Sequence, residues 1–408
     1  MNCYIPSNFD FEKLFPDCLK YRDKYYYFIH KIIEERIFDK RYEKDSFIHL
    51  YSEVIKNIIG VRIFYKMRYN LLNKNVIEIN HRYSDILHFS KGYRLTDTFS
   101  GVKHKKVNIE DEKILQRVNR YKLKLTNDIP EGSEYKFLYN NLNKINIDHL
   151  EALNFINQNY SFDPYIFNSF KISIDYINDK SFFFVVDNIA GRVHTNISNL
   201  SRELRPFLNF EGKPLINIDI SNSQPFLFNT LIQNYFVKYP QHYYLHNINN
   251  LQSISPYVVH FKDIELFERL TSEGRFYEYL MKKAGIKNED RQKFKKDFFG
   301  KVFFCNSNDK YVYKETKLFR ELFPNVYKVI LHYKKEDYKQ LAINLQKTEA
   351  NLMINKVCKR ISEERPDIFV TTIHDSILTT SENKDYICNI ILNEFEKNYN
   401  LKPSIKIE

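Results

Sequence analysis

The first part of the chain carries hydrophobic residues at helical spacing. In KYYYFIHKIIEERIF (residues 24–38) and FIHLYSEVIKNIIGVRIFYKM (47–67), apolar side chains recur every three or four positions. This period places them along one face of a helix. We therefore predict a mainly helical region that extends to about residue 185.

The pattern changes after residue 185. KPLINIDISNS (213–223) and DIFVTTIHDSILTT (367–380) are rich in β-branched residues around an acid, which predicts one buried strand and two short strands joined by a turn. Residues 225–236 and 382–399 return to helical spacing. Pro225 fits there because the first turn of a helix needs no amide donor. The chain is predicted to be an α+β protein.

Two acids, Asp219 and Asp375, each lie at the end of one of these β segments. If both segments belong to one sheet, the two carboxylates lie side by side. Adjacent carboxylates on a rigid sheet are what a two-metal phosphoryl-transfer site needs, and they suit Mg²⁺. The simpler alternative is that Asp375 faces water in an ordinary turn.

A cationic and aromatic stripe follows the first acid. In RQKFKKDFFGKVFF (291–304), Arg291, Lys295, Phe299 and Phe303 are four residues apart, so they line one side of a helix. Cations followed by rings suit a nucleoside triphosphate, with the cations on the phosphates and a ring against the base or sugar. An amphipathic helix with a basic flank is the alternative.

Composition favours a globular protein with a polyanionic partner. Of 408 residues, 43% are hydrophobic, and the net charge is +11 with a pI of about 9.0. Nucleic acid is the expected partner, although chains from AT-rich genomes are often basic without one. Basic residues cluster in one short region, at Lys103, Lys105, Lys106, Lys113, Arg117, Arg120, Lys122 and Lys124. This cluster is either a template-binding surface or a solvated helix face.

Cysteines and apolar runs exclude several protein classes. The five cysteines are scattered and form no CxxC pair, which argues against a zinc site or a disulfide framework. The apolar run FFFVV (182–186) is too short to span a bilayer. MNCYIPSNFDFEKLF at the N-terminus lacks the pattern of a signal peptide. We expect a cytoplasmic protein that does not bind membranes.

Five stretches, in order, resemble the motifs of family A polymerases, the bacterial DNA polymerase I type and the related single-subunit phage RNA polymerases. They are GRVHTNISNL (191–200, the first palm motif), INIDISNSQPF (216–226, motif A), RQKFKKDFFGKVFF (291–304, motif B), LQKTEANLM (345–353, the helix before motif C) and TTIHDSIL (371–378, motif C). The resemblance covers roughly residues 185–385.

The resemblance implies a right-hand polymerase with an antiparallel palm sheet and helical fingers. A helical N-terminal, thumb-like region that binds the template would occupy residues 1–185. The palm would occupy 186–256 and 324–408, and the fingers 257–323. With about 185 residues before the palm, we expect no proofreading exonuclease.

The resemblance also implies residue roles. Asp219 and Asp375, with the carbonyl of Ile220, would hold two Mg²⁺ ions, for which Mn²⁺ can substitute. Arg291 and Lys295 would bind the triphosphate, and Phe299 and Phe303 would pack on the nucleotide. Arg192, Gln346 and His374 would contact the primer terminus. Lys105, Lys106 and Lys113, which belong to the basic cluster, would bind the template.

Some residues depart from the DNA polymerase pattern. Ser376 follows Asp375 where DNA polymerases carry Glu, as in the single-subunit RNA polymerases. Gln224 stands five residues after Asp219, where DNA polymerases use a Glu to exclude the ribose 2′-OH. Phe303 replaces the usual Tyr, and Phe304 replaces a Gly. We expect dNTPs as substrates, with imperfect discrimination against rNTPs.

The expected function is synthesis of short DNA products, as in the family A polymerase-like primases of bacterial mobile elements such as the staphylococcal cassettes. The expected partners are single-stranded template, primer-template duplex, dNTPs, a small accessory protein and a replicative helicase. One alternative is a primer-dependent gap-filling or repair polymerase without proofreading. Another is an inactive polymerase-like subunit that binds nucleic acid. A metal nuclease would explain the two acids but not the cationic stripe.

Overall fold

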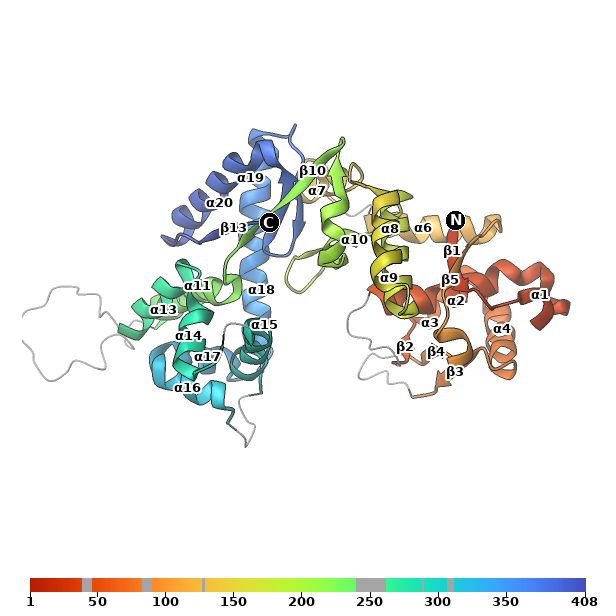
Figure 1. Cartoon of the computed structure of the whole chain (residues 1–408), viewed down its shortest axis with the longest axis horizontal. Helices are drawn as coiled ribbons and strands as arrows, with labels where there is room; N and C mark the ends of the chain where they lie inside the picture. The colour runs from red at the N-terminus through yellow and green to blue at the C-terminus, as the bar shows by residue number, and fades with distance from the viewer. Residues whose placement is uncertain (39–45, 83–89, 127–128, 240–261, 288–289, 307–311) are drawn as a thin grey trace, which may run out of the picture. The chain divides into compact units, whose positions relative to one another are not determined.

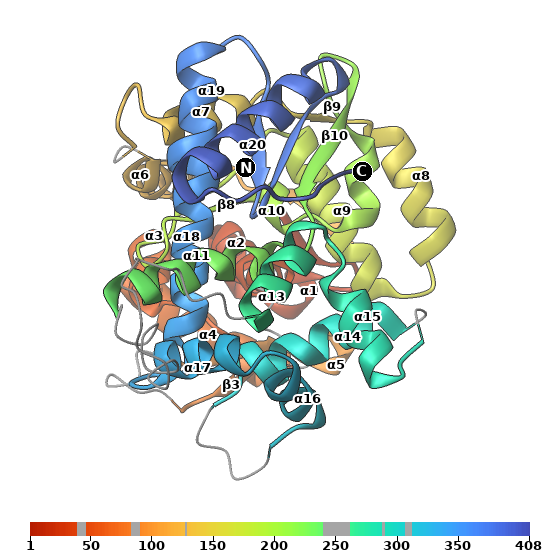
Figure 2. The ribbon, with the colours of Figure 1, turned by 90° about the vertical axis from the view of Figure 1, so that its left-hand side faces the viewer.

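Figures 1 and 2 show the computed structural model, which describes residues 1–38, 46–82, 90–126, 129–239, 262–287, 290–306 and 312–408. The chain divides into two compact units. Unit 1 comprises Met1–Pro130, Asn143–Val185 and Thr195–Gly212. Unit 2 comprises Glu131–Leu142, Val186–His194 and Lys213–Glu408.

The two units are interleaved along the chain, and the expected domains remain predictions. The expected boundary at residue 185 is the end of one segment of unit 1, but 195–212 also belongs to unit 1 and 131–142 to unit 2. The expected palm–fingers boundary at residue 256 lies outside the described residues. The division into palm and fingers remains a prediction.

Unit 1 is mainly helical. Its helices are α1 (Phe11–Leu14), α2 (Arg22–Phe38), α3 (Ser52–Ile59), α4 (Val61–Asn73), α5 (Asp97–Ser100), α6 (Glu112–Thr126), α8 (His149–Tyr160), α9 (Pro164–Asn178) and α10 (Asn196–Asn199), with 3₁₀ turns η1 (Pro16–Tyr21) and η2 (Arg202–Phe207). Its strands are β1 (Asn2–Pro6), β2 (Ile48–His49), β3 (Ile77–Asn80), β4 (Gly92–Leu95), β5 (His104–Asn108), β6 (Asn146–Ile147) and β9 (Leu208–Phe210). Strands β7 (Phe184–Val186) and β8 (Val193–Thr195) lie where the chain passes from one unit to the other.

Helix α2 lies at the centre of the unit 1 core. Its buried side chains include the consecutive residues Tyr27, Phe28 and Ile29, which point to different sides of the helix. Phe28 meets the rings of Phe64 and Tyr93 edge-on, at centroid distances of 5.9 and 5.2 Å. A helix surrounded in this way is stabilised by burial of apolar area on most of its circumference.

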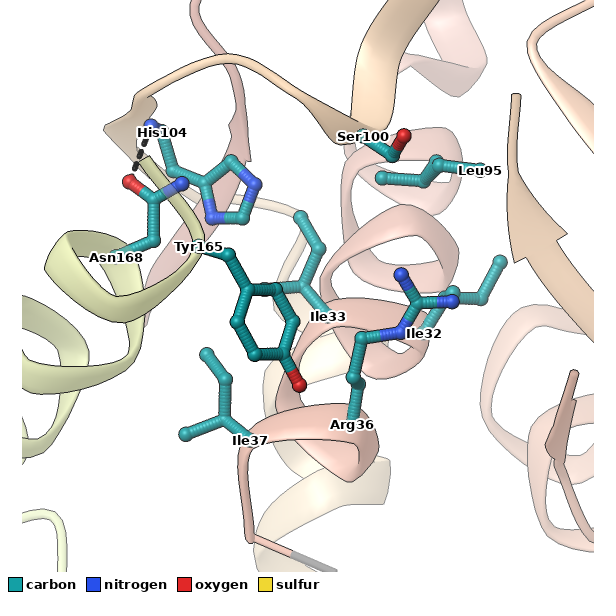
Figure 3. Close-up of a pocket in the computed structure, with 9 residues that line it drawn as sticks. All are labelled: Ile32, Ile33, Arg36, Ile37, Leu95, Ser100, His104, Tyr165 and Asn168. Atoms are coloured by element: carbon teal, nitrogen blue, oxygen red, sulfur yellow. Dashed lines mark hydrogen bonds between the residues drawn. The ribbon is translucent and has the colours of Figure 1, made fainter. Parts of the chain in front are cut away.

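A small cavity lies in unit 1 between α2, α9 and the start of β5 (Figure 3). Its volume is about 30 Å³, and Arg36, His104, Tyr165 and Asn168 are among its lining residues. Asn168 accepts a hydrogen bond from the backbone N–H of His104 at 2.8 Å. A space of this size suits about two water molecules and is too small for an organic ligand.

Unit 2 contains a small antiparallel sheet. Strand β10 (Lys213–Ile220) lies between β12 (Ser376–Thr380) and β13 (Ile405–Ile407), and β11 (Thr371–Ile373) pairs with the other edge of β12. All residues of β11 and β12 are buried. β-branched side chains favour this half-covered, pleated environment.

The rest of unit 2 is helical. Its helices are α7 (Glu134–Leu142), α11 (Ser223–Lys238), α13 (Lys262–Ser272), α14 (Phe276–Ala284), α15 (Arg291–Phe298), α16 (Lys314–Leu322), α17 (Pro324–Lys334), α18 (Gln340–Leu352), α19 (Lys359–Glu364) and α20 (Lys384–Tyr399), with π-helices η4 (Phe299–Phe303) and η5 (Met353–Cys358) and the 3₁₀ turn η6 (Ser381–Asn383). Helices α13 to α16 share an aromatic core in which Phe267 contacts the rings of Phe276 and Phe319.

The predicted elements of unit 2 are present, with one difference. The strand at 213–220, the paired strands around the His-Asp turn, and the helices after Pro225 and after residue 382 are confirmed. The helix expected over 291–304 is not uniform, because it changes at Phe299 into a π-helix. A π-helix hydrogen-bonds residues five apart. Here the N–H of Phe304 donates to the carbonyl of Phe299 at 2.9 Å, which brings Phe304 beside Phe299.

At the level of the whole chain, the fold is a mixture of helices and strands that includes an antiparallel sheet. The right-hand polymerase arrangement remains a prediction. Every helix among the described residues is too short or too polar to cross a bilayer. The five cysteines are free thiols.

Candidate active site

The sheet of unit 2 brings Asp219 and Asp375 together. In the register of β10 and β12, Asp219 stands directly opposite Ser376, the residue that follows Asp375. Directly opposed residues in an antiparallel pair have Cα atoms about 4.5–5.5 Å apart. Asp375, in the turn that precedes β12, therefore lies close to Asp219 on β10, although 156 positions separate them in the sequence (375 − 219).

The electrostatics of Asp219 agree with this closeness. Burial raises the pKa of Asp219 to about 6, and the negative charges of Asp375 and Glu408 add to the rise. Lys295 and the backbone N–H of Ile220 oppose it. The site thus concentrates negative charge that a bound cation would neutralise.

The turn that carries Asp375 has an unusual backbone. His374 adopts a left-handed conformation with φ of 54°, which is uncommon for residues other than glycine. Ser376 is buried and donates its hydroxyl to the carbonyl of Ile373 at 3.0 Å, across the turn. Ser376, which stands where the DNA polymerase pattern has a Glu, therefore closes the turn and holds Asp375 in place.

The donor set fits Mg²⁺. Two carboxylates on a rigid sheet are hard oxygen ligands, and Mg²⁺ commonly binds one or two of them and fills its other positions with water and phosphate oxygens. The described residues contain no group of three or more His, Cys, Asp or Glu side chains that could hold a metal by themselves. Ile220 reaches Asp219 through its N–H, and the role of its carbonyl remains a prediction.

Helix α15 carries the two expected triphosphate-binding cations. Lys295 acts on the charge of Asp219, so this end of α15 lies near the acids. Both cations lie near the ring of Tyr277, with Arg291 at 5.8 Å and Lys295 at 5.7 Å from its centroid. Arg291 also donates to Glu278 at 2.6 Å. That ion pair would have to exchange or share Arg291 with a phosphate.

The aromatic part of the stripe lies partly in the core. Phe303 is 0% exposed and packs against Phe228 and Phe298. Phe303 is a core residue in this structure, and contact of its ring with a nucleotide remains a prediction. Phe299 is only partly buried; it meets Phe303 edge-on at 5.8 Å and stacks on Phe304, which is 36% exposed, with centroids 5.6 Å apart. The π-helical hydrogen bond from the N–H of Phe304 to the carbonyl of Phe299 brings these two rings together.

Sequence reasoning missed Glu349, which joins two of the expected site residues. Glu349 is 1% exposed on α18, and its Oε2 accepts hydrogen bonds from Arg192 at 2.5 Å and from Gln224 at 2.8 Å. Burial raises the pKa of Glu349 to about 7, with Arg192 opposing the rise and Asp375 adding to it. The available signal was the spacing of Glu349 from Leu345 and Leu352, which places this acid on a helix face with apolar residues.

Arg192, His374 and Gln346 are the residues expected at the primer terminus. Arg192 is bound to Glu349 rather than free. The ring of His374 lies 6.3 Å from that of His194, and Gln346 lies partly buried on α18, one turn before Glu349. A role of these residues at a primer terminus remains a prediction.

The basic cluster belongs to unit 1 and is partly engaged in its fold. Lys105 donates to the carbonyl of Phe9 at 3.1 Å, and Lys106 pairs with Asp179 at 2.7 Å. Lys113 is exposed. Of these three lysines, Lys113 has the side chain that is most available to a polyanion.

Comparisons with known proteins give little further information. No protein-family model matches the chain, and no curated protein matches it. Among solved structures, the POL domain of Pol1 from M. smegmatis in complex with DNA primer-template and dNTP is similar in part. The match covers 63% of this chain and 54% of that chain, with 12% sequence identity and a TM-score of 0.27. This chain thus spans about half the length of that structure, and a TM-score this low supports no inference about activity.

Proposed function

We propose that this chain is a template-directed nucleotidyltransferase of the family A polymerase type, which makes short DNA products from dNTPs. The observation that supports this best is the pairing of β10 with β12, which places Asp219 beside Asp375 with Lys295 close enough to act on the charge of Asp219. Paired carboxylates next to a cation match the needs of phosphoryl transfer from a nucleoside triphosphate.

Each residue of the site has a task in this proposal. Asp219 and Asp375 hold the divalent cations, which when bound polarise phosphate oxygens and neutralise the charge that develops on them. Lys295 and Arg291 bind and orient the triphosphate. Phe299 and Phe304 provide a partly exposed ring surface on which the base or sugar packs.

We further propose that the products are primers, made for replication of a mobile element. Support comes from the resemblance of GRVH and IHDS to polymerases that start chains without a primer. The basic and mainly helical unit 1 offers template contacts in place of a large thumb. A small accessory protein and a replicative helicase are the proposed partners.

Two alternatives differ in what they require. A gap-filling polymerase would use the same site but would need an annealed primer. An inactive nucleic-acid-binding subunit would have no use for Asp219, whose carboxylate is held near another acid at a cost in stability. The charge concentration at the site therefore favours an enzyme.

The test is incorporation of labelled dNTPs and rNTPs on a single-stranded template, with Mg²⁺ or Mn²⁺, with and without an annealed primer. The control variants are Asp375→Asn, which keeps the shape of the side chain, and Asp367→Asn, which changes an exposed acid that is paired with Arg365. We expect products in the wild type and in D367N, and a loss of at least about a hundredfold in D375N.

The primer arm separates the two enzymatic alternatives. Products without a primer would establish primer synthesis, and products only with a primer would establish gap filling. Equal incorporation by D375N and the wild type would contradict the assignment of the metal site. A complete absence of products, with template binding intact, would favour the inactive subunit.

A further inference from the structure

Glu349 is a buried acid that holds two side chains of the candidate active site at once. A single oxygen, Oε2, accepts from Nη2 of Arg192 at 2.5 Å and from Nε2 of Gln224 at 2.8 Å. The other oxygen, Oε1, is buried and has no hydrogen-bond partner among the described residues. Burying a carboxylate costs several kcal/mol unless it is well paired, so we expect Glu349 to lower the stability of the fold.

The chemistry of a carboxylate determines how Gln224 is held. An ionised carboxylate can only accept hydrogen bonds, so Gln224 must present its NH₂ group to Glu349. Its amide plane is then fixed by one strong, charge-assisted hydrogen bond. Without that bond, the half-buried side chain could rotate among several rotamers.

The position of Gln224 gives this bond a consequence. Gln224 lies in the first turn of α11, five residues after Asp219. The resemblance to family A polymerases implies that the sugar of the incoming nucleotide lies beside this turn, since Gln224 stands where DNA polymerases use a Glu to exclude the ribose 2′-OH. A fixed side chain there blocks the space beside the sugar, whereas a mobile one leaves room for an additional hydroxyl.

We propose that Glu349 is a positioning residue that fixes Gln224 against the sugar of the incoming nucleotide and so excludes the ribose 2′-OH. This inference rests on the proposed polymerase function and specifies which substrates the site selects. It also assigns Arg192 a different task from primer contact, because its guanidinium pairs with Glu349 and favours the ionised form of the acid.

The test compares substitutions that differ only in the hydrogen bonds they keep. Glu349→Ala removes both bonds. Glu349→Gln can place its amide oxygen where Oε2 lies and so keep both. Glu394→Ala is the matched control, since Glu394 is 6% exposed in the same unit and is also bonded by an arginine, Arg360 at 3.1 Å.

Two quantities are measured for each protein. The first is the ratio of kcat/KM for ATP to that for dATP on a primed template. The second is the ratio of the Kd values for the same nucleotides, obtained by competition against a fluorescent dATP analogue. We expect E349A to shift both ratios toward ATP by about tenfold, the effect of losing one hydrogen bond to a charged group. E349Q should stay within about threefold of the wild type, and E394A should not differ from it.

A second variant covers the case in which E349A fails to fold because Arg192 is left buried without its partner. The double substitution Arg192→Met with Glu349→Met removes both charges at similar volume, which buried ion pairs often tolerate. It also leaves Gln224 without its anchor, so the same tenfold shift toward ATP is expected.

The outcomes separate this inference from the proposed function. Incorporation by the wild type with unchanged or lower ATP use in E349A and in the double variant would overturn the inference and leave the function standing. A shift in the binding ratio without any incorporation would support the inference and overturn the proposed catalysis. Failure of the wild type to bind either nucleotide would overturn both.

Discussion

At the scale of single residues, the candidate active site is defined by charges that are close together in a partly buried place. Asp219 has a raised pKa because it is buried and because Asp375 and Glu408 lie nearby. Glu349 has a raised pKa because it is buried almost completely. Both acids would be more stable in water, so the fold keeps them at a cost that ligand binding would offset.

The pH dependence of stability tests the charge on Asp219. The pKa is raised from its ordinary value of 3.8 to about 6, so the folded protein binds this proton more tightly than the unfolded chain does. Its contribution to stability is complete at low pH and is lost as the pH rises from about 4 to about 6. Without metal, D219N should therefore be more stable than the wild type at pH 7.5, by about 1 kcal/mol after allowance for partial exposure.

Thermal unfolding in EDTA and in Mg²⁺ measures this difference. Mg²⁺ should raise the Tm of the wild type and leave D219N almost unchanged, because the variant offers one carboxylate fewer. At pH 4 without metal, the two proteins should have similar Tm values. A wild type that is as stable as D219N at pH 7.5 in EDTA would show that the carboxylate carries no electrostatic cost.

Lys295 provides a second prediction at this scale. Lys295→Ala should raise KM for dNTPs by about tenfold and leave the Kd for template unchanged, because it removes a charge-assisted contact with phosphate. The control is Lys293→Ala, which changes an exposed lysine of the same helix. Equal effects of the two substitutions on KM would mean that Lys295 contributes only to the general positive charge.

At the scale of elements, the change from α15 to the π-helix η4 brings a further ring beside Phe299. Phe303 enters the aromatic core of unit 2 and meets Phe299 edge-on at 5.8 Å. Phe304, whose N–H donates to the carbonyl of Phe299, stacks on Phe299 and is partly exposed. Short π-helical segments often occur at functional sites, and this one adds Phe304 to the rings of the stripe.

Substitutions of Phe303 and of Phe299 test which of the two rings belongs to the core. Phe303→Ala should lower the free energy of unfolding by about 3–5 kcal/mol, as expected for a large ring removed from a core. Phe299→Ala should cost less stability and should mainly raise KM for dNTPs. Urea denaturation and steady-state kinetics distinguish the two. A larger loss of stability in F299A than in F303A would contradict the assignment of Phe303 to the core.

At the scale of the whole molecule, the two units carry different parts of the proposed function. The candidate active site lies within unit 2, and the basic cluster lies within unit 1. A net charge of +11 favours binding to a nucleic acid backbone without sequence preference. Division of the chain into a catalytic and a template-binding unit predicts that template affinity and catalysis can be lost separately.

Charge reversal in unit 1 tests this separation. Glu at positions 105, 106 and 113 in place of lysine should weaken binding to single-stranded DNA and reduce its salt dependence, while KM for dNTPs at saturating template stays the same. The exchange Lys106→Asp with Asp179→Lys keeps the ion pair of unit 1 and controls for stability. Unchanged affinity and salt dependence would mean that the cluster is only a solvated surface.

The sequence by itself determined the local features of this protein. The strands around Asp219 and Asp375, the helix after Pro225 and the two cations on α15 follow from residue spacing, because periodicity and β-branching act over a few neighbouring positions. Only the tertiary structure decided the β10–β12 register, the burial of Phe303 and the hydrogen bonds of Glu349 to Arg192 and Gln224. These depend on contacts between residues far apart in the chain, where the cost of burying a ring or a charge is set by partners that no local pattern specifies.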